Sequence, residues 1–321
     1  NTSYTVKGLY DVMEGLVVRA SVGTGFRAPG LGDLAANTTF SAEYHNDYIV
    51  CTAQGISREK CPEEQVNTYI SANPNLGPET SESANFGVMY TLGNHSLAVD
   101  WFSTEIDGVI TGIAVQDIID AAGLGASYVA TLSGQGAYCE RLNGQADANL
   151  QQCFTNPING NKFSVAGTDI KYSGLFETSV GEFDVNLGMV IMDESKSEAF
   201  YNGPVVNFVG LTSTPEMRYS LDVGHTLQAV PNLSLTAQYE YIDALADSYS
   251  ADYVAIGSVS EWTQVNLRAV YVVPGMENLS LSLAARNLTK EDPPLNSSGE
   301  FNRAIHPNLG MSMIFGFSLD L

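Results

Sequence analysis

The sequence has little positive charge. Its 321 residues include 14 Lys and Arg against 36 Asp and Glu, which gives a formal net charge of −22 at pH 7. Proteins that bind nucleic acid neutralise phosphate groups with lysine and arginine. The acidic excess therefore argues against nucleic acid as a partner. Hydrophobic residues still make up 44% of the chain, so the charge does not indicate disorder.

Long hydrophobic runs are missing as well. No stretch of about 20 apolar residues occurs, which excludes a transmembrane helix. A secretory signal peptide is also missing, and Asn1 leads directly into the strand-like segment SYTVKGLY. We therefore expect that further sequence of a longer protein precedes Asn1. One class of membrane protein escapes such a hydropathy scan, namely the β-barrel, because its strands are only half apolar.

Known catalytic motifs are likewise missing. The chain has no G-x-S-x-G, HExxH or P-loop pattern, so we expect no enzyme, no catalytic residue and no cofactor. The segment around His45 and the acidic pairs Asp193/Glu194 and Glu291/Asp292 offer oxygen or nitrogen ligands. Solvated loop residues explain these groups better than a metal does. The sequence therefore predicts no metal site.

Cysteine is scarce, and its four residues form two local pairs in stretches rich in Gly, Asn, Gln and Pro. Four cysteines allow three disulfide connectivities. We favour the local one, which closes two short loops, over metal binding or free thiols. It predicts an oxidising compartment. The predicted bonds join Cys51 to Cys61 and Cys139 to Cys153.

The sequence is rich in apolar residues at every second position. Side chains two residues apart share one face of a β-strand, so each such segment has an apolar face and a polar face. The pattern recurs in the segments 84–92, 217–227, 233–243, 265–271, 279–286 and 311–321.

Short and long connections separate these segments. Short turns are expected at 13–15, 93–94, 181–182, 230–232 and 274–278. Long polar stretches lie at roughly 28–82, 114–162, 193–213, 244–260 and 290–307. Loops of that length are unusual in a compact soluble domain but typical of one end of an outer-membrane barrel. The sequence predicts an all-β, antiparallel transmembrane β-barrel with about eleven strands present.

Two environments fit the same alternation. In a soluble sandwich the apolar faces meet in a dry core, whereas in a transmembrane barrel they meet lipid and the polar faces line a wet lumen. Strand length, aromatic residues near segment ends and the unequal loops favour the barrel. Arginines at the polar alternate positions of the strands would then point into the lumen. The alternative is that they are ordinary strand residues in contact with solvent. These are Arg19, Arg218, Arg268 and Arg286.

Several segments resemble signatures of one membrane-protein family, the TonB-dependent outer-membrane receptors. GTGFRAPGLGDL (23–34) resembles the family's G-x-GFRAP-x-L-x-(E/D)-L signature, and NPNLGPETSESANFGVMY (73–90) resembles the start of its next strand. VDWFSTEIDGVI (99–110), VAGTDIKYS (165–173), AARNLTKEDPPL (284–295) and the final MSMIFGFSLDL resemble later segments in family order. The resemblance covers roughly residues 18–321.

The resemblance implies a specific architecture. Residues 1–321 would be the C-terminal half of a barrel of about 22 strands, without the N-terminal plug domain and the first half of the wall. Arg27 would join the four arginines above as a residue that faces the lumen near the plug. Pro29 would end strand pairing where the chain leaves the membrane.

The resemblance also implies a function. Such receptors bind a scarce nutrient at the surface of a Gram-negative cell and import it with energy from the TonB complex. The implied partners are that complex, the plug domain, outer-membrane lipid with lipopolysaccharide, and a small nutrient ligand. Siderophore, haem, cobalamin and oligosaccharide remain open as ligands. The alternatives are a passive porin and a secreted β-rich carbohydrate-binding domain.

Overall fold

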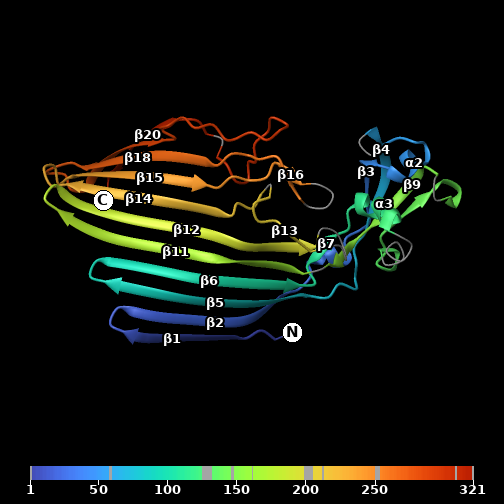
Figure 1. Cartoon of the computed structure of the whole chain (residues 1–321), viewed down its shortest axis with the longest axis horizontal. Helices are drawn as coiled ribbons and strands as arrows, with labels where there is room; N and C mark the ends of the chain where they lie inside the picture. Colours follow the sequence, from blue (N-terminus) through green and yellow to red (C-terminus); the bar gives the residue numbers. More distant parts are fainter. Residues whose placement is uncertain are drawn as a thin grey trace.

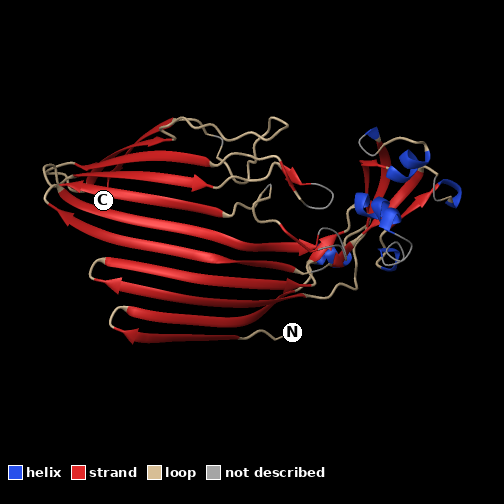
Figure 2. Cartoon of the chain, in the orientation of Figure 1, coloured by secondary structure: helices blue, strands red, loops and turns tan. Residues whose placement is uncertain are grey.

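One long curved sheet and one small unit make up the protein. The computed structural model describes residues 2–57, 60–124, 132–145, 148–160, 162–198, 205–211, 213–249, 254–307 and 309–319. The small unit lies beyond one end of the long sheet, and the helices gather at that end (Figures 1 and 2). We call this end of the sheet the loop end and the opposite end the turn end.

The long sheet is antiparallel throughout and follows the chain order. Its strands are β1 (Thr5–Met13), β2 (Leu16–Arg27), β5 (Glu79–Leu92), β6 (His95–Asp107), β11 (Phe163–Thr178), β12 (Gly181–Glu198), β14 (Met217–Leu227), β15 (Leu233–Ile242), β18 (Trp262–Val272), β19 (Leu279–Arg286) and β20 (Ser312–Leu319). The short β13 (Val205–Asn207) pairs with β12. The predicted C-terminal strand is thus present to Leu319, and its last two residues lie outside the described part of the chain.

The register places the apolar parity of every strand on one face of the sheet. Val18 lies opposite Val88, which lies opposite Val99, and the row continues into Ile170 and Met189. Side chains of this face remain exposed, as with Phe317 at 76%. A sandwich would bury such residues in a second protein layer. The apolar face therefore requires an apolar environment outside the described chain, as the barrel interpretation predicts.

Aromatic rings gather at both ends of the apolar face. At the turn end, the rings of Phe183 and His225 stack with centroids 4.1 Å apart. At the loop end, Tyr219 and Tyr241 stack at 5.0 Å. Rings with one apolar and one polar portion favour the boundary between hydrocarbon and water. The two belts mark the expected edges of a lipid layer.

The turn end consists of tight hairpins, and one of them differs from the sequence prediction. The turn between β11 and β12 lies at residues 179–180 and not at 181–182. The Thr178 hydroxyl donates to the Gly181 carbonyl at 2.7 Å and accepts the Val180 N–H at 3.3 Å. This side-chain-to-backbone bonding closes the chain two residues earlier than the Gly-Glu pair suggested.

The long polar stretches are not all structureless loops. Segments within 28–82 and 114–162 form a second sheet of β3 (Thr39–Asn46), β4 (Glu63–Ile70), β9 (Leu150–Thr155) and β8 (Tyr138–Arg141), in that order. Helices α2 (Tyr48–Ala53) and α3 (Val115–Leu124) accompany it, and we call these six elements the loop unit. No described helix is long and apolar enough to cross a membrane.

Shorter elements connect the loop unit to the long sheet. They are α1 (Leu31–Ala35) and the paired strands β7 (Ile110–Gly112) and β10 (Pro157–Asn159). Within the loop unit, the 3₁₀ turn η2 (Leu142–Gly144) follows β8 on the way to β9. Farther along the chain, β16 (Ser248–Tyr249) pairs with β17 (Ala255–Ile256).

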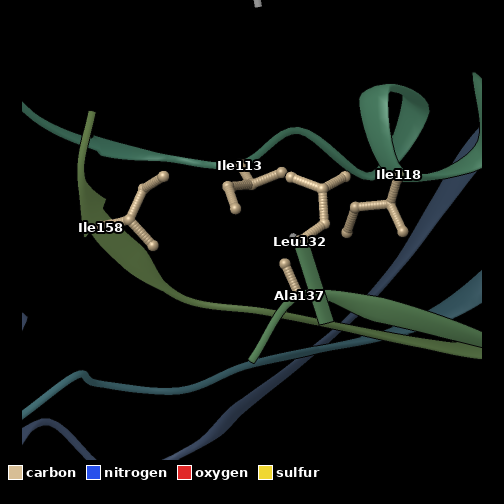
Figure 3. Packing of buried hydrophobic residues seen from close by; sticks show 5 residues of the cluster. All are labelled: Ile113, Ile118, Leu132, Ala137 and Ile158. Carbon is tan, nitrogen blue, oxygen red and sulfur yellow. The ribbon is translucent and has the colours of Figure 1, made fainter. Parts of the chain in front are cut away.

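Two buried hydrophobic clusters lie in and beside the loop unit, and a third, of Val206, Leu211 and Ala246, lies at β13 and the loops near it. Ile113, Ile118, Leu132, Ala137 and Ile158 form one buried cluster (Figure 3). Helix α3 also packs through Val115 and Ile119 on Val66 and Cys153 of the small sheet. The loop unit therefore folds around its own hydrophobic core, while the apolar face of the long sheet stays exposed.

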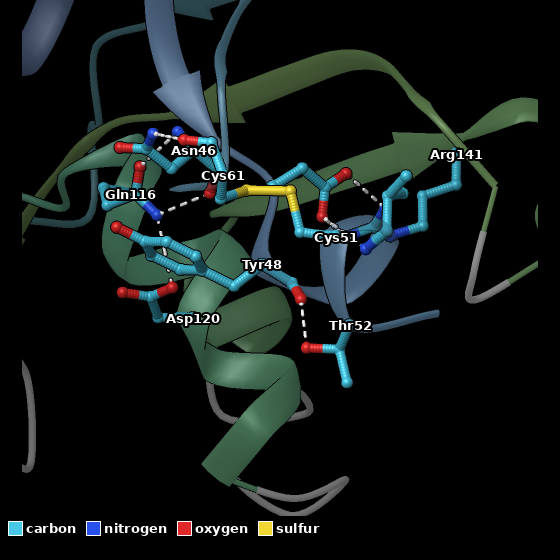
Figure 4. The surroundings of a disulfide bond; sticks show 10 residues. Asn46, Tyr48, Cys51, Thr52, Cys61, Gln116, Asp120 and Arg141 are labelled. Atoms are coloured by element: carbon cyan, nitrogen blue, oxygen red, sulfur yellow. Dashed lines mark hydrogen bonds and ion pairs between the residues drawn. A yellow bond between two sulfur atoms is a disulfide. The ribbon is translucent and has the colours of Figure 1, made fainter. Parts of the chain in front are cut away.

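Two disulfides reinforce the loop unit. Cys51 is bonded to Cys61 and Cys139 to Cys153, which are the two local pairs favoured from the sequence. The first bond ties α2 to the start of β4, and beside it the Asn46 amide donates to the Cys61 carbonyl at 3.0 Å (Figure 4). Covalent closure of a short loop reduces the entropy of the unfolded chain, so a small unit with a modest core gains stability.

Candidate functional site

A cavity of about 560 Å³ lies at the loop end, on the polar face of the long sheet. Arg27, Glu79 and Phe163 line it from the ends of β2, β5 and β11. Its outer wall comes from β7, β10 and α3, through residues such as Thr111, Ile158 and Asp117. We call this space the mouth cavity. Its volume falls in the range of small-ligand pockets.

An ion pair between Arg27 and Glu79 forms part of the mouth cavity's lining. The guanidinium Nε and Nη2 atoms each lie 2.5 Å from one oxygen of the Glu79 carboxylate. The same carboxylate accepts the backbone N–H of Ile110 at 2.7 Å. Glu79 is buried and its carboxylate is shared among three segments, so it connects β2 and β5 to the chain leading into the loop unit. The arginine of the GFRAP segment thus positions the outer wall of the cavity.

Charged groups of both signs surround the opening. Lys162 donates to Glu105 at 2.6 Å and lies 3.3 Å from Asp107, and these hydrogen bonds raise the pKa of its ammonium group. On the other side, burial raises the pKa of the Asp117 carboxyl, and the neighbouring charge of Asp120 adds to this shift. The lining of the mouth cavity therefore combines the ion-paired cationic side chains of Arg27 and Lys162 with the Asp117 carboxyl, whose raised pKa disfavours its ionised form.

Replacing Asp117 with Asn is expected to stabilise the protein at pH 7. A carboxyl with a raised pKa in the folded state binds its proton more tightly there, so its contribution to stability is present at low pH. That contribution is lost as the pH rises through the raised pKa, and the buried charge then destabilises the fold. Thermal unfolding of D117N and of the unchanged protein should differ at pH 7 and converge below about pH 4. A gain that does not change with pH would contradict this explanation.

A second ion pair crosses the polar face in the middle of the sheet. Arg19 on β2 and Asp100 on β6 flank Gly87 on β5, and the three residues lie in register. The guanidinium reaches over β5 to the Asp100 carboxylate, with Nε at 2.7 Å and Nη2 at 2.5 Å. A Cβ atom on Gly87 would overlap the Asp100 carboxylate and come within 3.0 Å of the Arg19 Nε. Glycine at position 87 is therefore what allows this bidentate pair.

Gly87→Val is expected to destabilise the sheet by about 1–3 kcal/mol, because the added side chain forces the Arg19–Asp100 pair apart. Gly188→Val is the matched control. It lies on the same polar face in β12, three strands farther along the sheet, where an added Cβ meets nothing within 4 Å. Denaturant unfolding of both variants in detergent micelles measures the difference. Equal losses for the two would show that the pair does not explain the glycine.

The register places the five predicted arginines on the polar face of the long sheet but not at one point. Arg19 and Arg27 lie on β2, and only Arg27 among the five lines the mouth cavity. The others lie farther along the sheet and reach its polar face from different strands. They are Arg218 on β14, Arg268 on β18 and Arg286 on β19. Whether this face borders a plugged lumen stays a prediction.

His45 and the acidic pairs considered as metal ligands, Asp193/Glu194 and Glu291/Asp292, do not come together in a metal site. His45 lies 3.6 Å from Glu43, on the side of β3 that faces the helices of the loop unit. Among the described residues, no group of three or more His, Cys, Asp or Glu side chains is placed to hold a metal ion.

The outer wall of the mouth cavity was not predicted from the sequence. The residues of β7, β10 and α3 fall inside stretches that read as polar loops. One available signal was the apolar spacing of Val115, Ile118 and Ile119, which repeats with the period of a helix. The pairing of β7 with β10 joins segments more than forty residues apart, between Gly112 and Pro157, and no local pattern reports it.

Residues 1–288 match the family described as "TonB dependent receptor-like, beta-barrel". The chain belongs to this family. It is therefore a protein of the bacterial outer membrane, and the family is one of transport receptors. The long sheet is barrel wall, its apolar face is the lipid side, and its polar face is the inner side.

Solved structures of the same fold resemble the whole chain. The ferric enterobactin receptor PfeA of Pseudomonas aeruginosa is 15% identical, with a TM-score of 0.63, over 99% of this chain and 40% of that one. For the siderophore receptor PirA of Acinetobacter baumannii the values are 11%, 0.65, 99% and 41%. For the FrpB iron transporter of Neisseria meningitidis they are 10%, 0.60, 99% and 38%. A comparison with characterised protein sequences found no significant match. The chain thus spans about 40% of the length of the structures it resembles.

Proposed function

We propose that this protein imports a scarce nutrient across the outer membrane, with energy coupled through TonB. The mouth cavity is the observation that carries the proposal. It lies at the loop end of the inner face, where a ligand captured from outside would enter the barrel. The wall binds and guides the ligand, and no covalent chemistry is assigned to it.

A ferric siderophore is the ligand class we favour over haem, cobalamin or an oligosaccharide. PfeA, PirA and FrpB are named for ferric enterobactin, siderophore and iron transport, respectively. The mouth cavity could accept part of such a ligand, since its lining combines the ion-paired cationic side chains of Arg27 and Lys162 with the apolar side chains of Ile106 and Phe163.

The proposed partners follow from the architecture. The described long sheet has β1 and β20 at its ends, and further strands would close it into a barrel of about 22 strands around a plug domain. The Arg19–Asp100 pair and the other inner-face arginines would lie next to that plug. Lipid and lipopolysaccharide would cover the apolar face, and the TonB complex would act on the plug.

A transport assay tests the proposal. Iron-starved cells with the gene deleted should lose uptake of a radiolabelled ferric siderophore, and restoring the gene should return uptake only where TonB is functional. In the complemented strain, Arg27→Met should reduce uptake severalfold, because it leaves the buried Glu79 carboxylate unpaired at the cavity. Lys196→Met, which removes an exposed ion pair with Glu194, is the matched control. Uptake that persists without TonB would contradict active transport.

A further inference from the structure

Four segments of chain connect the loop unit to the long sheet, and we call them together the neck. They are residues 28–38, 71–78, 108–114 and 156–162. The third and fourth segments contain β7 and β10, the two paired strands of the mouth cavity's outer wall. The position of this wall therefore depends on what holds the neck segments together.

The side chain of Asn159 binds to two other segments of the neck. Its Oδ1 atom accepts the Gly77 backbone N–H at 2.7 Å. Its Nδ2 atom donates to the Gly77 carbonyl at 2.9 Å and to the Gly108 carbonyl at 3.0 Å. One amide side chain thus makes the hydrogen bonds that a neighbouring strand would make. Because Asn159 itself belongs to β10, it links three of the four neck segments.

The Asn159 side chain lies on the far side of β10 from the mouth cavity. Its neighbours Ile158 and Gly160 line the cavity. Side chains alternate along a strand, so Asn159 points the other way, toward Gly77 and Gly108. Any effect of Asn159 on a ligand in the cavity must therefore act through the position of its neighbours.

Both strands of the outer wall are attached to the barrel side of the neck at one level. Asn159 lies directly opposite Ile110 in the β7–β10 pair. The Ile110 N–H donates to the Glu79 carboxylate at 2.7 Å, so β7 is held by Glu79 where β10 is held by Asn159. Nearer the loop unit, the Asn73 amide donates to the Pro157 carbonyl at 3.0 Å. The wall cannot move outward without breaking these bonds, and a cavity fixed in this way loses little conformational entropy on binding.

We propose that Asn159 is a positioning residue for ligand capture, which holds the β7–β10 wall at the width at which the mouth cavity fits its ligand. The inference rests on the proposed function for the ligand, but not for the wall. A ligand binds only the fraction of molecules in which the wall is in place, so the apparent affinity falls with that fraction. Loss of the Asn159 side chain therefore weakens binding although every residue that lines the cavity is unchanged.

Saturation kinetics of uptake test the effect on the ligand. The probe is radiolabelled ferric enterobactin, given to iron-starved cells that carry the full-length receptor. Asn159→Ala should raise the half-saturating concentration about tenfold and leave the maximal rate unchanged, because the wall moves and the energy coupling does not. Asn75→Ala is the matched control, an exposed asparagine of the same neck whose side chain makes no hydrogen bond within the described chain. A fall in the maximal rate alone would mean that N159A only lowers the amount of folded protein, and would overturn the positioning role.

Hydrogen exchange without ligand tests the wall itself. In N159A, purified in detergent, peptides with the amides of Gly77, Ile110 and Gly160 should lose protection, while those of β11 and β12 keep it. Unchanged protection would overturn the role of Asn159 whatever uptake shows. Lost protection with an unchanged half-saturating concentration would overturn its link to the ligand. No uptake of ferric enterobactin by the unchanged protein would contradict the proposed function, and the exchange result would then decide the role of Asn159 in the wall alone.

Discussion

Replacing Val223 with arginine is expected to destabilise the protein in a lipid bilayer by about 2–4 kcal/mol. Val223 lies near the middle of β14 on the apolar face, between Val185 and Ala237 on the adjacent strands. The aromatic belts lie above and below it, so a charge here would sit close to the centre of the hydrocarbon layer. Equilibrium unfolding in urea, with the protein inserted in phosphatidylcholine vesicles, measures the loss.

Ser220→Arg on the same strand is the matched control. Ser220 lies on the opposite, polar face, directly across from Glu240 on β15 and Gly188 on β12. An arginine there has water and a carboxylate within reach, so the free energy of unfolding should change by no more than about 0.5 kcal/mol. Similar losses for the two variants would mean that lipid does not cover the apolar face, and the membrane assignment of this sheet would fail.

Arg141→Met is expected to destabilise the loop unit by about 3–5 kcal/mol. The Arg141 Nη1 atom lies 2.7 Å from Asp47 Oδ2, and Nη2 lies 3.1 Å from Oδ1. Both side chains are largely buried, at 12% and 7% exposure. Asp47 also caps α2 by accepting the Val50 N–H. Removing the arginine leaves a buried carboxylate without its cation beside a disulfide-bonded helix (Figure 4).

Hydrogen exchange locates this effect within the molecule. In R141M, amides of β8, β9 and α2 should lose protection, whereas those of β11 and β12 in the wall should keep it. Lys196→Met removes the exposed pair with Glu194 and should cost less than about 1 kcal/mol. Loss of protection across the wall in R141M would show that the loop unit and the wall unfold together.

The strands of the wall and their apolar face could be predicted from the sequence alone. Strand side chains alternate with a period of two, and a one-residue slip would move a whole apolar set to the wrong face. Segments such as 279–286 therefore revealed both the strand and the face that meets lipid. The error of two residues at the β11–β12 turn arose because the Thr178 hydroxyl closes the turn, and strand alternation carries no information about such side-chain bonding.

Pairs of residues that meet across the wall were less accessible from the sequence. Arg27 was expected on the inner face, and its partner Glu79, 52 residues away, lies in the NPNLGPET segment that resembles a family signature. Nothing in either segment indicated that these two side chains pair. The sequence gives no sign that Gly87 differs from other strand glycines. Its role follows from the register, which places it between Arg19 and Asp100. Which residue an arginine pairs with depends on which strands become neighbours. Where a long loop separates two strands, no local sequence pattern shows that they are neighbours.

Local sequence patterns were enough to predict an antiparallel wall with one apolar face, short turns at one end, long connections at the other and two local disulfides. That segments within 28–82 and 114–162 fold together is visible only once the chain is folded. Strand β4 pairs in parallel with β9, so that Thr68 meets Cys153 across 85 positions of sequence. Alternation and turn chemistry are local and can be read along the chain. The mouth cavity exists because distant segments meet, and that depends on burying the core around α3.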